Sequence, residues 1–186
     1  MLRSLIITIM VFVPVATVSA DSLDVNFSNE SVRAIYNLDR GTKDFSFGGL
    51  FVNPDQGSSA TLLHAGLEVT GDGYSGDNVF EGRLGFRGYL LSTDTVDVSA
   101  LAIGGQVKLF PQGSKVGFGI NAFYAPEIVT GLDGDRFWEW GARLEFRLFE
   151  TGTLYVGFRE VQIRLEGSTR DVTIDDGGFI GLDIKF

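Results

Sequence analysis

Apolar and polar residues alternate with a period of two along most of the chain. The clearest stretch is RFWEWGARLEFRLF, residues 136–149, where even positions from 138 to 148 are apolar and odd positions from 139 to 147 are charged or glycine. An α-helix would scatter these residues around its circumference, whereas a β-strand separates them onto two faces. The same period recurs in residues 61–70, 79–91 and 114–124, and no stretch keeps a helical period. The pattern predicts an all-β protein.

Clusters of Gly, Asp, Asn, Pro and Ser separate the alternating segments and are typical of turns. Residues 22–38 supply either one long kinked strand or a hairpin about Asn29–Glu30. We expect eight to ten antiparallel strands, an even number if the sheet closes into a barrel in the usual way. The remaining predicted strands cover residues 44–52, 60–70, 79–91, 96–110, 114–125, 135–149, 152–166 and 176–186.

Two segments break the alternation. In TLYVGFREVQIRL, residues 153–165, the apolar positions change from even to odd parity near Arg159–Glu160. A slip of one residue turns every later side chain to the opposite face, so a β-bulge is predicted there. The segment VDVSALAIGGQVKLF, residues 96–110, also drifts in phase, and its Gly104–Gly105 pair predicts a bend in the sheet.

Alternation reports two faces but not which face meets water. A soluble barrel of the lipocalin kind, with its apolar face inward, shares the pattern with a membrane barrel, whose apolar face meets lipid. Three features favour lipid outside: large aromatic residues near strand ends, glycines on the charged parity, and an apolar alternation that continues to Phe186. The prediction is a closed antiparallel transmembrane β-barrel with a filled polar interior. The aromatic residues assigned to interfacial girdles are Phe110, Tyr124, Phe137, Trp138, Trp140 and Tyr155.

The first twenty residues have the pattern of a secretory signal peptide. Arg3 precedes an apolar run from Leu5 to Val13, and Val-Ser-Ala at 18–20 has the spacing of a cleavage site. A membrane anchor is the alternative, but the run is short and Pro14 interrupts it. We expect cleavage after Ala20, export, and one outer-membrane barrel domain over residues 21–186.

Composition restricts the partners. The chain has 24 acidic and 15 basic residues, a net charge of −9 and no cysteine. An acidic chain with so few basic clusters is a poor ligand for nucleic acid, so no nucleic-acid partner is expected. The lack of cysteine weighs lightly against a disulfide scaffold. After the signal no apolar run is long enough for a membrane helix, so contact with the lipid core requires a closed sheet.

The end of the sequence resembles the assembly signal of bacterial outer-membrane proteins, which has a glycine, alternating apolar residues and a terminal aromatic residue. Gly181, Ile184 and Phe186 fit this pattern, and Phe179 departs from it, because a polar residue is expected there. Four longer stretches are similar to the YfaZ family of proteobacterial, and so Gram-negative, outer-membrane proteins: GGQVKLFPQGSKVGFGINAFYAPE (104–127), RFWEWGARLEFR (136–147), LYVGFREVQI (154–163) and DDGGFIGLDIKF (175–186).

This resemblance implies a small barrel in the cell outer membrane and implies no activity for any residue. We expect outer-membrane lipid and, during biogenesis, the barrel-assembly machinery as partners, and a monomer. The leading hypothesis is a structural or interaction barrel with a plugged, charged lumen. The alternatives are a narrow, porin-like channel for small solutes and, third, a lipid-modifying enzyme.

Charged residues of both signs share the predicted inner face. In a small barrel the interior is just wide enough for side chains to fill it, and buried charges are tolerated only when they are paired. We therefore expect a cross-linked lumen without an open pore. The predicted luminal network consists of Glu81, Arg83, Arg87, Lys108, Glu139, Arg143, Glu145, Arg147 and Arg164.

Few residues could carry chemistry. His64 is the single histidine; it lies on the polar parity near Glu68, with no serine two positions away, so a satisfied interior histidine is expected rather than a catalytic one. One histidine and no cysteine leave few ligands for a transition metal. The acidic runs at 71–77 and 133–135 lack EF-hand spacing and are expected to be solvated loops. No catalytic, cofactor or metal site is predicted.

Overall fold

The computed structural model describes residues 21–55, 58–75 and 78–186, and the predicted signal peptide, residues 1–20, lies outside the described residues. In the described part of the chain no helix is long and apolar enough to cross a membrane. The elements are β1 Ser22–Phe27, β2 Ser31–Asp39, β3 Lys43–Val52, β4 Ala60–Ser75, β5 Asn78–Thr93, β6 Asp97–Pro111, β7 Val116–Ala125, the 3₁₀ helix η1 Glu127–Val129, β8 Thr130–Leu132, β9 Gly134–Phe149, β10 Gly152–Leu165 and β11 Asp171–Lys185.

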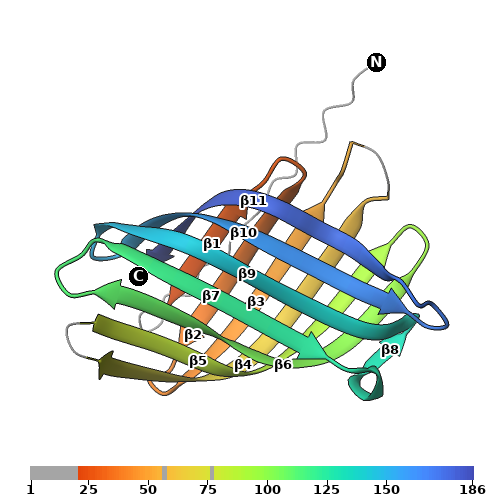
Figure 1. Ribbon diagram of the computed structural model, residues 1–186, viewed down its shortest axis with the longest axis horizontal. Helices are drawn as coiled ribbons and strands as arrows, with labels where there is room; N and C mark the ends of the chain where they lie inside the picture. Colours follow the sequence, from red (N-terminus) through yellow and green to blue (C-terminus); the bar gives the residue numbers. More distant parts are fainter. Residues whose placement is uncertain (1–20, 56–57, 76–77) are drawn as a thin grey trace.

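Ten of these strands close into an antiparallel barrel (Figure 1). Each strand pairs with the next along the chain, except that the short β8 pairs with one end of β6 and β7 lies beside β9. Pairing of β1 with β11 completes the ring. The predicted closed barrel is confirmed at the upper end of the expected strand number, and residues 22–39 form a hairpin, the second of the two alternatives.

The two ends of the barrel differ. The end that we call the terminal end holds the start of β1, the end of β11, the end of β4 with the start of β5, and the connections 40–42, 112–115 and 150–151. The opposite end, the loop end, holds the connections 28–30, 53–59, 94–96, 126–133 and 166–170. The connections at the loop end are on the whole longer, and the longest contains η1 and β8.

Several strands are longer than the sequence predicts. β4 runs to Ser75 and β5 begins at Asn78, although the composition of residues 71–78 predicts a turn. β11 begins at Asp171 rather than near residue 176. The ladder continues because these residues still pair across each hairpin, as Gly71 does with Gly82. Cross-strand pairing thus overrides the low strand preference of glycine and aspartate.

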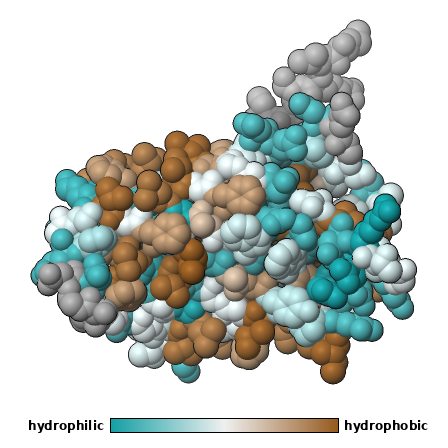
Figure 2. All heavy atoms as spheres, viewed as in Figure 1, coloured by the Kyte–Doolittle hydropathy of each residue, from teal (hydrophilic) through white to brown (hydrophobic). Residues whose placement is uncertain are grey.

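The outer face of the barrel carries the apolar side chains. On β9, Leu144 and Phe146 are exposed, whereas Glu145 between them is buried in the lumen. Figure 2 shows hydrophobic side chains gathered over the middle of the visible face, with hydrophilic side chains concentrated at the loop end, on the right. Alternation therefore separates the two faces as the sequence predicts.

Only half of the aromatic residues assigned to girdles lie on the outer face. The exposed ones are Tyr124, Trp138 and Trp140. Phe110, Phe137 and Tyr155 point inward and are at most 3% exposed, so their assignment to a girdle is wrong. Each has the inward parity of its strand, and rings fill the space over inward glycines. A Cβ added to Gly117 would lie 2.3 Å from the ring of Phe110.

β10 keeps one face inward along its whole length. Arg159, Val161 and Ile163 are all buried, so the change of parity is not a bulge in β10, and that prediction is wrong. The polarity of the two faces of β10 changes instead: near the loop end its inward residues are apolar and its outward residues are polar. A register shift does occur beside Val161, but the extra residue is Ile174 of β11.

β6 behaves in the same way across its glycine pair. Ala100, Ala102 and Lys108 are all buried on the inner face, on both sides of Gly104–Gly105. The pair marks a close approach of neighbouring strands, because a Cβ on Gly104 would lie 2.1 Å from the carbonyl oxygen of Ala122. The apparent drift in phase again reflects apolar residues that face the lumen.

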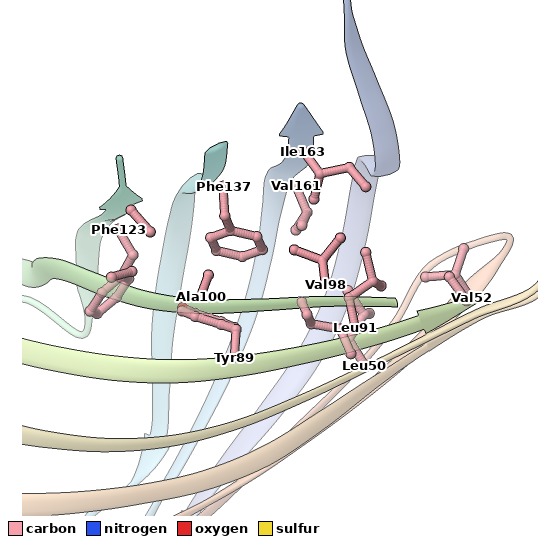
Figure 3. Close-up of a cluster of buried hydrophobic side chains, with 14 residues drawn as sticks. Leu50, Val52, Tyr89, Leu91, Val98, Ala100, Phe123, Phe137, Val161 and Ile163 are labelled. Atoms are coloured by element: carbon pink, nitrogen blue, oxygen red, sulfur yellow. The ribbon is translucent and has the colours of Figure 1, made fainter. Parts of the chain in front are cut away.

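The lumen near the loop end is filled by an apolar layer (Figure 3). Its aromatic centre is the pair Tyr89 and Phe137, whose ring centroids lie 4.3 Å apart. The predicted polar interior is thus correct for the rest of the lumen and wrong here. The apolar layer consists of Leu50, Val52, Ala60, Leu62, Tyr89, Leu91, Val98, Ala100, Ala102, Phe123, Ala125, Phe137, Val161 and Ile163.

Candidate functional site

Buried ion pairs meet in the middle of the lumen, directly next to the apolar layer. Arg33 Nη1 of β2 lies 2.6 Å from Glu139 Oε1 of β9, and the Tyr89 hydroxyl donates to Glu139 Oε2 at 3.0 Å. Arg87 Nε donates to Glu68 Oε1 at 2.7 Å. All five side chains are buried. Each charge has a partner of opposite sign, which is the condition under which charges are tolerated away from water.

A second group of ion pairs lies closer to the terminal end and joins β1, β6, β9 and β11. Arg143 Nη1 is 2.9 Å from Asp24 Oδ2, and Arg143 Nε is 2.6 Å from Glu145 Oε1. Lys108 Nζ lies 3.5 Å from Glu145 and 3.8 Å from Asp183. These contacts therefore link strands that are not neighbours in the sheet, and Arg143 and Lys108 share the carboxylate of Glu145.

The structure places most of the predicted network residues in the lumen. Arg83 pairs with Asp44 at 3.0 Å. Glu81 and Arg147 pair with each other at 3.2 Å and are partly exposed, with Arg147 over the ring of Phe110. The predicted residues that take part in the two buried groups are Arg87, Lys108, Glu139, Arg143 and Glu145.

Arg164 does not belong to this network. It follows the buried Ile163 on β10 and therefore has the outward parity. Its guanidinium makes two hydrogen bonds to Asp171 of β11, at 2.9 and 3.0 Å, on the exterior. The luminal assignment of Arg164 is wrong, because it followed from the bulge that β10 does not contain.

Sequence reasoning missed most of the partners of the predicted network. They are Asp24, Arg33, Asp44, Glu68, Arg159, Asp175 and Asp183. A signal was present in SLDVNF, residues 22–27, where Asp24 and Asn26 alternate with Leu23, Val25 and Phe27. The parity of this short strand could have placed its polar residues inside.

A small polar cavity remains between the ion pairs. Its volume is about 60 Å³, and Arg33, Asn121 and Asp183 are among the residues that line it. Arg33 Nε and Asp183 Oδ1 are buried and have no hydrogen-bond partner among the described residues. A polar cavity of this size has room for a few water molecules, the usual partners of such atoms. It is too small for an organic solute.

The seam between β1 and β11 is short. Six residue pairs join the two strands, from Ser22–Lys185 to Phe27–Ile180, whereas β10 stays paired with β11 as far as Arg164–Asp171. Among the described strands, residues 171–179 of β11 therefore have a partner only on the β10 side. In Figure 1, β11 runs on toward the β10–β11 turn, away from the β1–β2 hairpin.

Arg159 connects the strands where this ladder ends. Its Nε donates to Asp175 Oδ2 of β11 at 2.7 Å, its Nη1 to Asn26 Oδ1 of β1 at 2.9 Å, and its Nη2 to Ser31 Oγ of β2 at 3.1 Å. The guanidinium also lies over the ring of Phe179, 5.2 Å from its centroid. One buried side chain thus holds four strands together in place of backbone hydrogen bonds.

The residues of the predicted assembly signal have distinct environments in β11. Gly181 is buried beneath the ring of Tyr155, and a Cβ there would lie 2.3 Å from the ring. Ile184 and Phe186 are exposed on the outer face, and Phe186 lies 6.2 Å from Tyr36, measured between ring centroids. Packing against Tyr155 therefore requires glycine at position 181, independently of any role in assembly.

His64 points into the lumen and is buried, 5.7 Å from Tyr89 between ring centroids. Its Nε2 has no hydrogen-bond partner among the described residues, so the histidine is interior but not fully satisfied. Within the described ranges no group of three or more His, Asp or Glu side chains could hold a metal ion. Asp133 Oδ2 instead accepts the backbone N–H of Asp97 at 3.0 Å, and Asp77 lies outside the described residues.

A closed barrel of ten strands, apolar outside and cross-linked by buried ion pairs inside, defines this chain as a small β-barrel protein. It belongs to the family described as YfaZ precursor, whose model matches residues 3–186, so the resemblance found in the sequence is confirmed. The description as a precursor implies a signal peptide and export. No curated protein matches the chain.

Proposed function

We propose that this chain is a small outer-membrane β-barrel whose lumen is closed, so that it serves as a structural or interaction protein rather than as a channel. Membership of the YfaZ precursor family and the exposed apolar outer face support a place in lipid. Closure of the sheet lets every backbone N–H and C=O of the barrel pair between strands, which a membrane requires. The apolar outer face is the surface that such a barrel presents to lipid.

The apolar layer is the observation that carries the proposal of a closed lumen. It spans the lumen from β3 to β10, and Leu50, Phe137 and Ile163 in it are at most 2% exposed. A dry apolar constriction opposes the passage of ions, because an ion must lose its hydration there without gaining polar partners. The ion pairs on its terminal side narrow the lumen but leave a small polar cavity among them.

The lengths of the connections support an orientation with the loop end outside the cell. Outer-membrane barrels have short turns on the periplasmic side and longer loops on the extracellular side. Here the terminal end has connections of two to four residues, whereas the loop end includes 53–59 and 126–133. Trp138 and Trp140, which donate to Gln162 and Glu160 at 2.8 and 2.6 Å, are suited to the outer interface.

The proposal includes no enzymatic activity. His64, the residue most suited to catalysis, faces the lumen rather than lipid. Outer-membrane lipid and, during assembly, the barrel-assembly machinery are the proposed partners of a monomer, with no nucleic acid.

Conductance across a planar bilayer tests the closed lumen. We expect no steady current through the parent protein and measurable current through the variant Leu50→Ala/Phe137→Ala/Ile163→Ala, which removes part of the apolar layer. The matched control Leu144→Ala/Phe146→Ala/Ile180→Ala removes the same side chains from the outer face and should stay silent. A steady, reproducible conductance of the parent protein would contradict the proposal and favour the narrow channel.

A further inference from the structure

The outer wall of the barrel has a depression on β4, β5 and β6, on the opposite side of the wall from the lumen. Its volume is about 540 Å³, within the range of small-molecule sites. At its centre two small outward residues lie side by side, because Ala65 of β4 pairs with Gly88 of β5. Leu63 and Leu90, which pair in the next outward row toward the loop end, border them there. Leu101 of β6, opposite Gly88, closes a second side.

The large side chains around the depression are apolar and point away from the lumen. Leu63, Leu90 and Leu101 are between 49% and 59% exposed. His64 and Tyr89 also line the depression, but their side chains are buried in the lumen, so they present only backbone to it. Among the described residues that line it there is no acid, lysine or arginine, and Ser99 supplies a single outward hydroxyl. Such a surface accepts hydrocarbon and offers no partner to a charged group.

The η1 turn borders the depression on the β6 side. Val129 at the end of η1 lines it together with the leucines of the wall. The Thr130 hydroxyl and the Val129 backbone N–H both donate to the carbonyl oxygen of Pro126, each at 3.0 Å, and these bonds fix the turn against the wall. In Figure 1 the turn between β7 and β8 projects at the loop end of the barrel. The depression is therefore concave, with walls from both the sheet and the connection.

The connection that contains η1 is also the apolar one at the loop end. Ile128 is 89% exposed and Leu132 is 64% exposed. The described residues of the other loop-end connections include no exposed large apolar side chain. Exposed apolar side chains that continue an apolar outer face are typical of contact with the interfacial layer of a membrane. The depression thus lies where the wall and the connection both present apolar groups to the same surroundings.

We propose that this depression binds one acyl chain of a membrane lipid and retains it longer than the rest of the outer face retains its lipid. The depression opens onto the apolar outer face, which continues around the barrel with Leu144 on β9 and Val156 on β10, so lipid hydrocarbon is the occupant that reaches it. Transfer from hydrocarbon to an apolar wall has no hydrophobic driving force, and the preference comes from closer van der Waals packing in a concave site. This inference rests on the proposed function, which places the outer face in lipid.

Relaxation of leucine methyl groups by a spin-labelled lipid tests the site. The protein is refolded in a neutral maltoside detergent and titrated with phosphatidylethanolamine that carries a nitroxide midway along one acyl chain. Leu63, Leu90 and Leu101 report on the depression, whereas Leu144 and Leu154 report on the outer face elsewhere. We expect relaxation at the first group to saturate, and to reach a given enhancement at a lipid fraction about fivefold lower than at the second group.

Filling the depression distinguishes a site from general contact with lipid. In Gly88→Leu the new side chain occupies the centre of the depression, and its Cβ has its nearest contact at 3.8 Å, so the wall accommodates it. The lipid fraction at half saturation should rise about fivefold, to the value of the outer face elsewhere. The matched control Gly178→Leu adds the same side chain at an exposed position of β11, where a Cβ has its nearest contact at 3.7 Å, and should leave the binding unchanged.

Three results would overturn the proposal: relaxation at Leu63, Leu90 and Leu101 that does not saturate, an equal loss in Gly178→Leu and Gly88→Leu, or a change from dimer to monomer in Gly88→Leu. The last, measured by sedimentation in the same detergent, would assign the depression to a second copy of the chain. If the leucines elsewhere on the outer face respond and only the depression fails to saturate, the proposed place in lipid stands. If no outward leucine responds, that place in lipid is contradicted as well.

Discussion

Two neighbouring residues of β9 provide the sharpest test of which face meets lipid. Leu144 points outward, is 53% exposed, and lies opposite Val156 and Phe118, which are also exposed. A charged side chain at mid-depth on the lipid face of a barrel costs about 2–4 kcal/mol. Leu144→Arg should therefore lower the free energy of unfolding by that amount. On a face that meets water the same change would cost roughly 0.5 kcal/mol or less.

Arg143→Leu changes the adjacent residue, which faces the lumen. The substitution strands Asp24, which pairs with Arg143 at 2.9 Å, whereas Glu145 keeps Lys108 at 3.5 Å. Breaking a buried ion pair costs about 3–5 kcal/mol. Asp24 still accepts the Tyr155 hydroxyl, so we expect the lower end, about 3 kcal/mol. Adding Asp24→Asn should restore most of the loss, because no buried charge is then left without a partner.

The assay is urea unfolding in lipid vesicles, followed by tryptophan fluorescence, for the parent, Leu144→Arg, Arg143→Leu and Arg143→Leu/Asp24→Asn. We expect Asp24→Asn to rescue Arg143→Leu, and no change of a luminal residue to rescue Leu144→Arg. If Leu144→Arg is as stable as the parent, and the protein refolds without lipid or detergent, the outer apolar face does not meet a membrane. The proposed localisation would then be wrong.

Two further predictions concern β10 and β11. Arg159→Leu should destabilise the barrel by about 3 kcal/mol and speed hydrogen exchange in β1, because it leaves Asp175 without its partner and removes the hydrogen bonds to Asn26 and Ser31. The control is Arg164→Leu on the exterior, which should change neither the stability nor the exchange rate. Equal effects of the two substitutions would show that Arg159 does not hold the seam between β1 and β11. Gly181→Ala should lower the free energy of unfolding in urea by about 1–3 kcal/mol, because the added Cβ meets the Tyr155 ring. The control Gly178→Ala, whose Cβ would have its nearest contact at 3.7 Å, should be close to neutral. Equal losses of stability in the two variants would refute packing against Tyr155 as the reason for glycine at position 181.

The sequence alone determined the faces of most strands. Alternation has a period of two, the period of a strand, so Leu144 and Glu145 could be assigned to opposite faces without any tertiary information. It also supplied the turn positions between the long strands, because glycine, proline and aspartate act locally on the backbone. Pairing of charges inside the barrel followed in general terms, since several arginines and glutamates share the inward parity.

Where the lumen changes from polar to apolar was decided only by the tertiary structure. On β10 the outward Leu154 and the inward Val161 are both apolar but have opposite parity. From the sequence this change of parity could mean either a bulge in the strand or a lumen that becomes apolar, and parity alone cannot distinguish the two. The surroundings of Val161 include Leu50, Leu91 and Val98, which lie on strands that do not pair with β10 and meet it only when the barrel closes.

The partner of each charge was likewise beyond the sequence. Arg143 pairs with Asp24, 119 residues away, and Arg159 pairs with Asn26, 133 residues away. Such contacts depend on the stagger of ten strands around the ring, because a shift of two residues in any one strand keeps every face and yet changes every partner. The open edge of β11 depends on the stagger in the same way: the register of β1 against β11 ends at Ile180, and among the described strands the earlier residues of β11 pair only with β10.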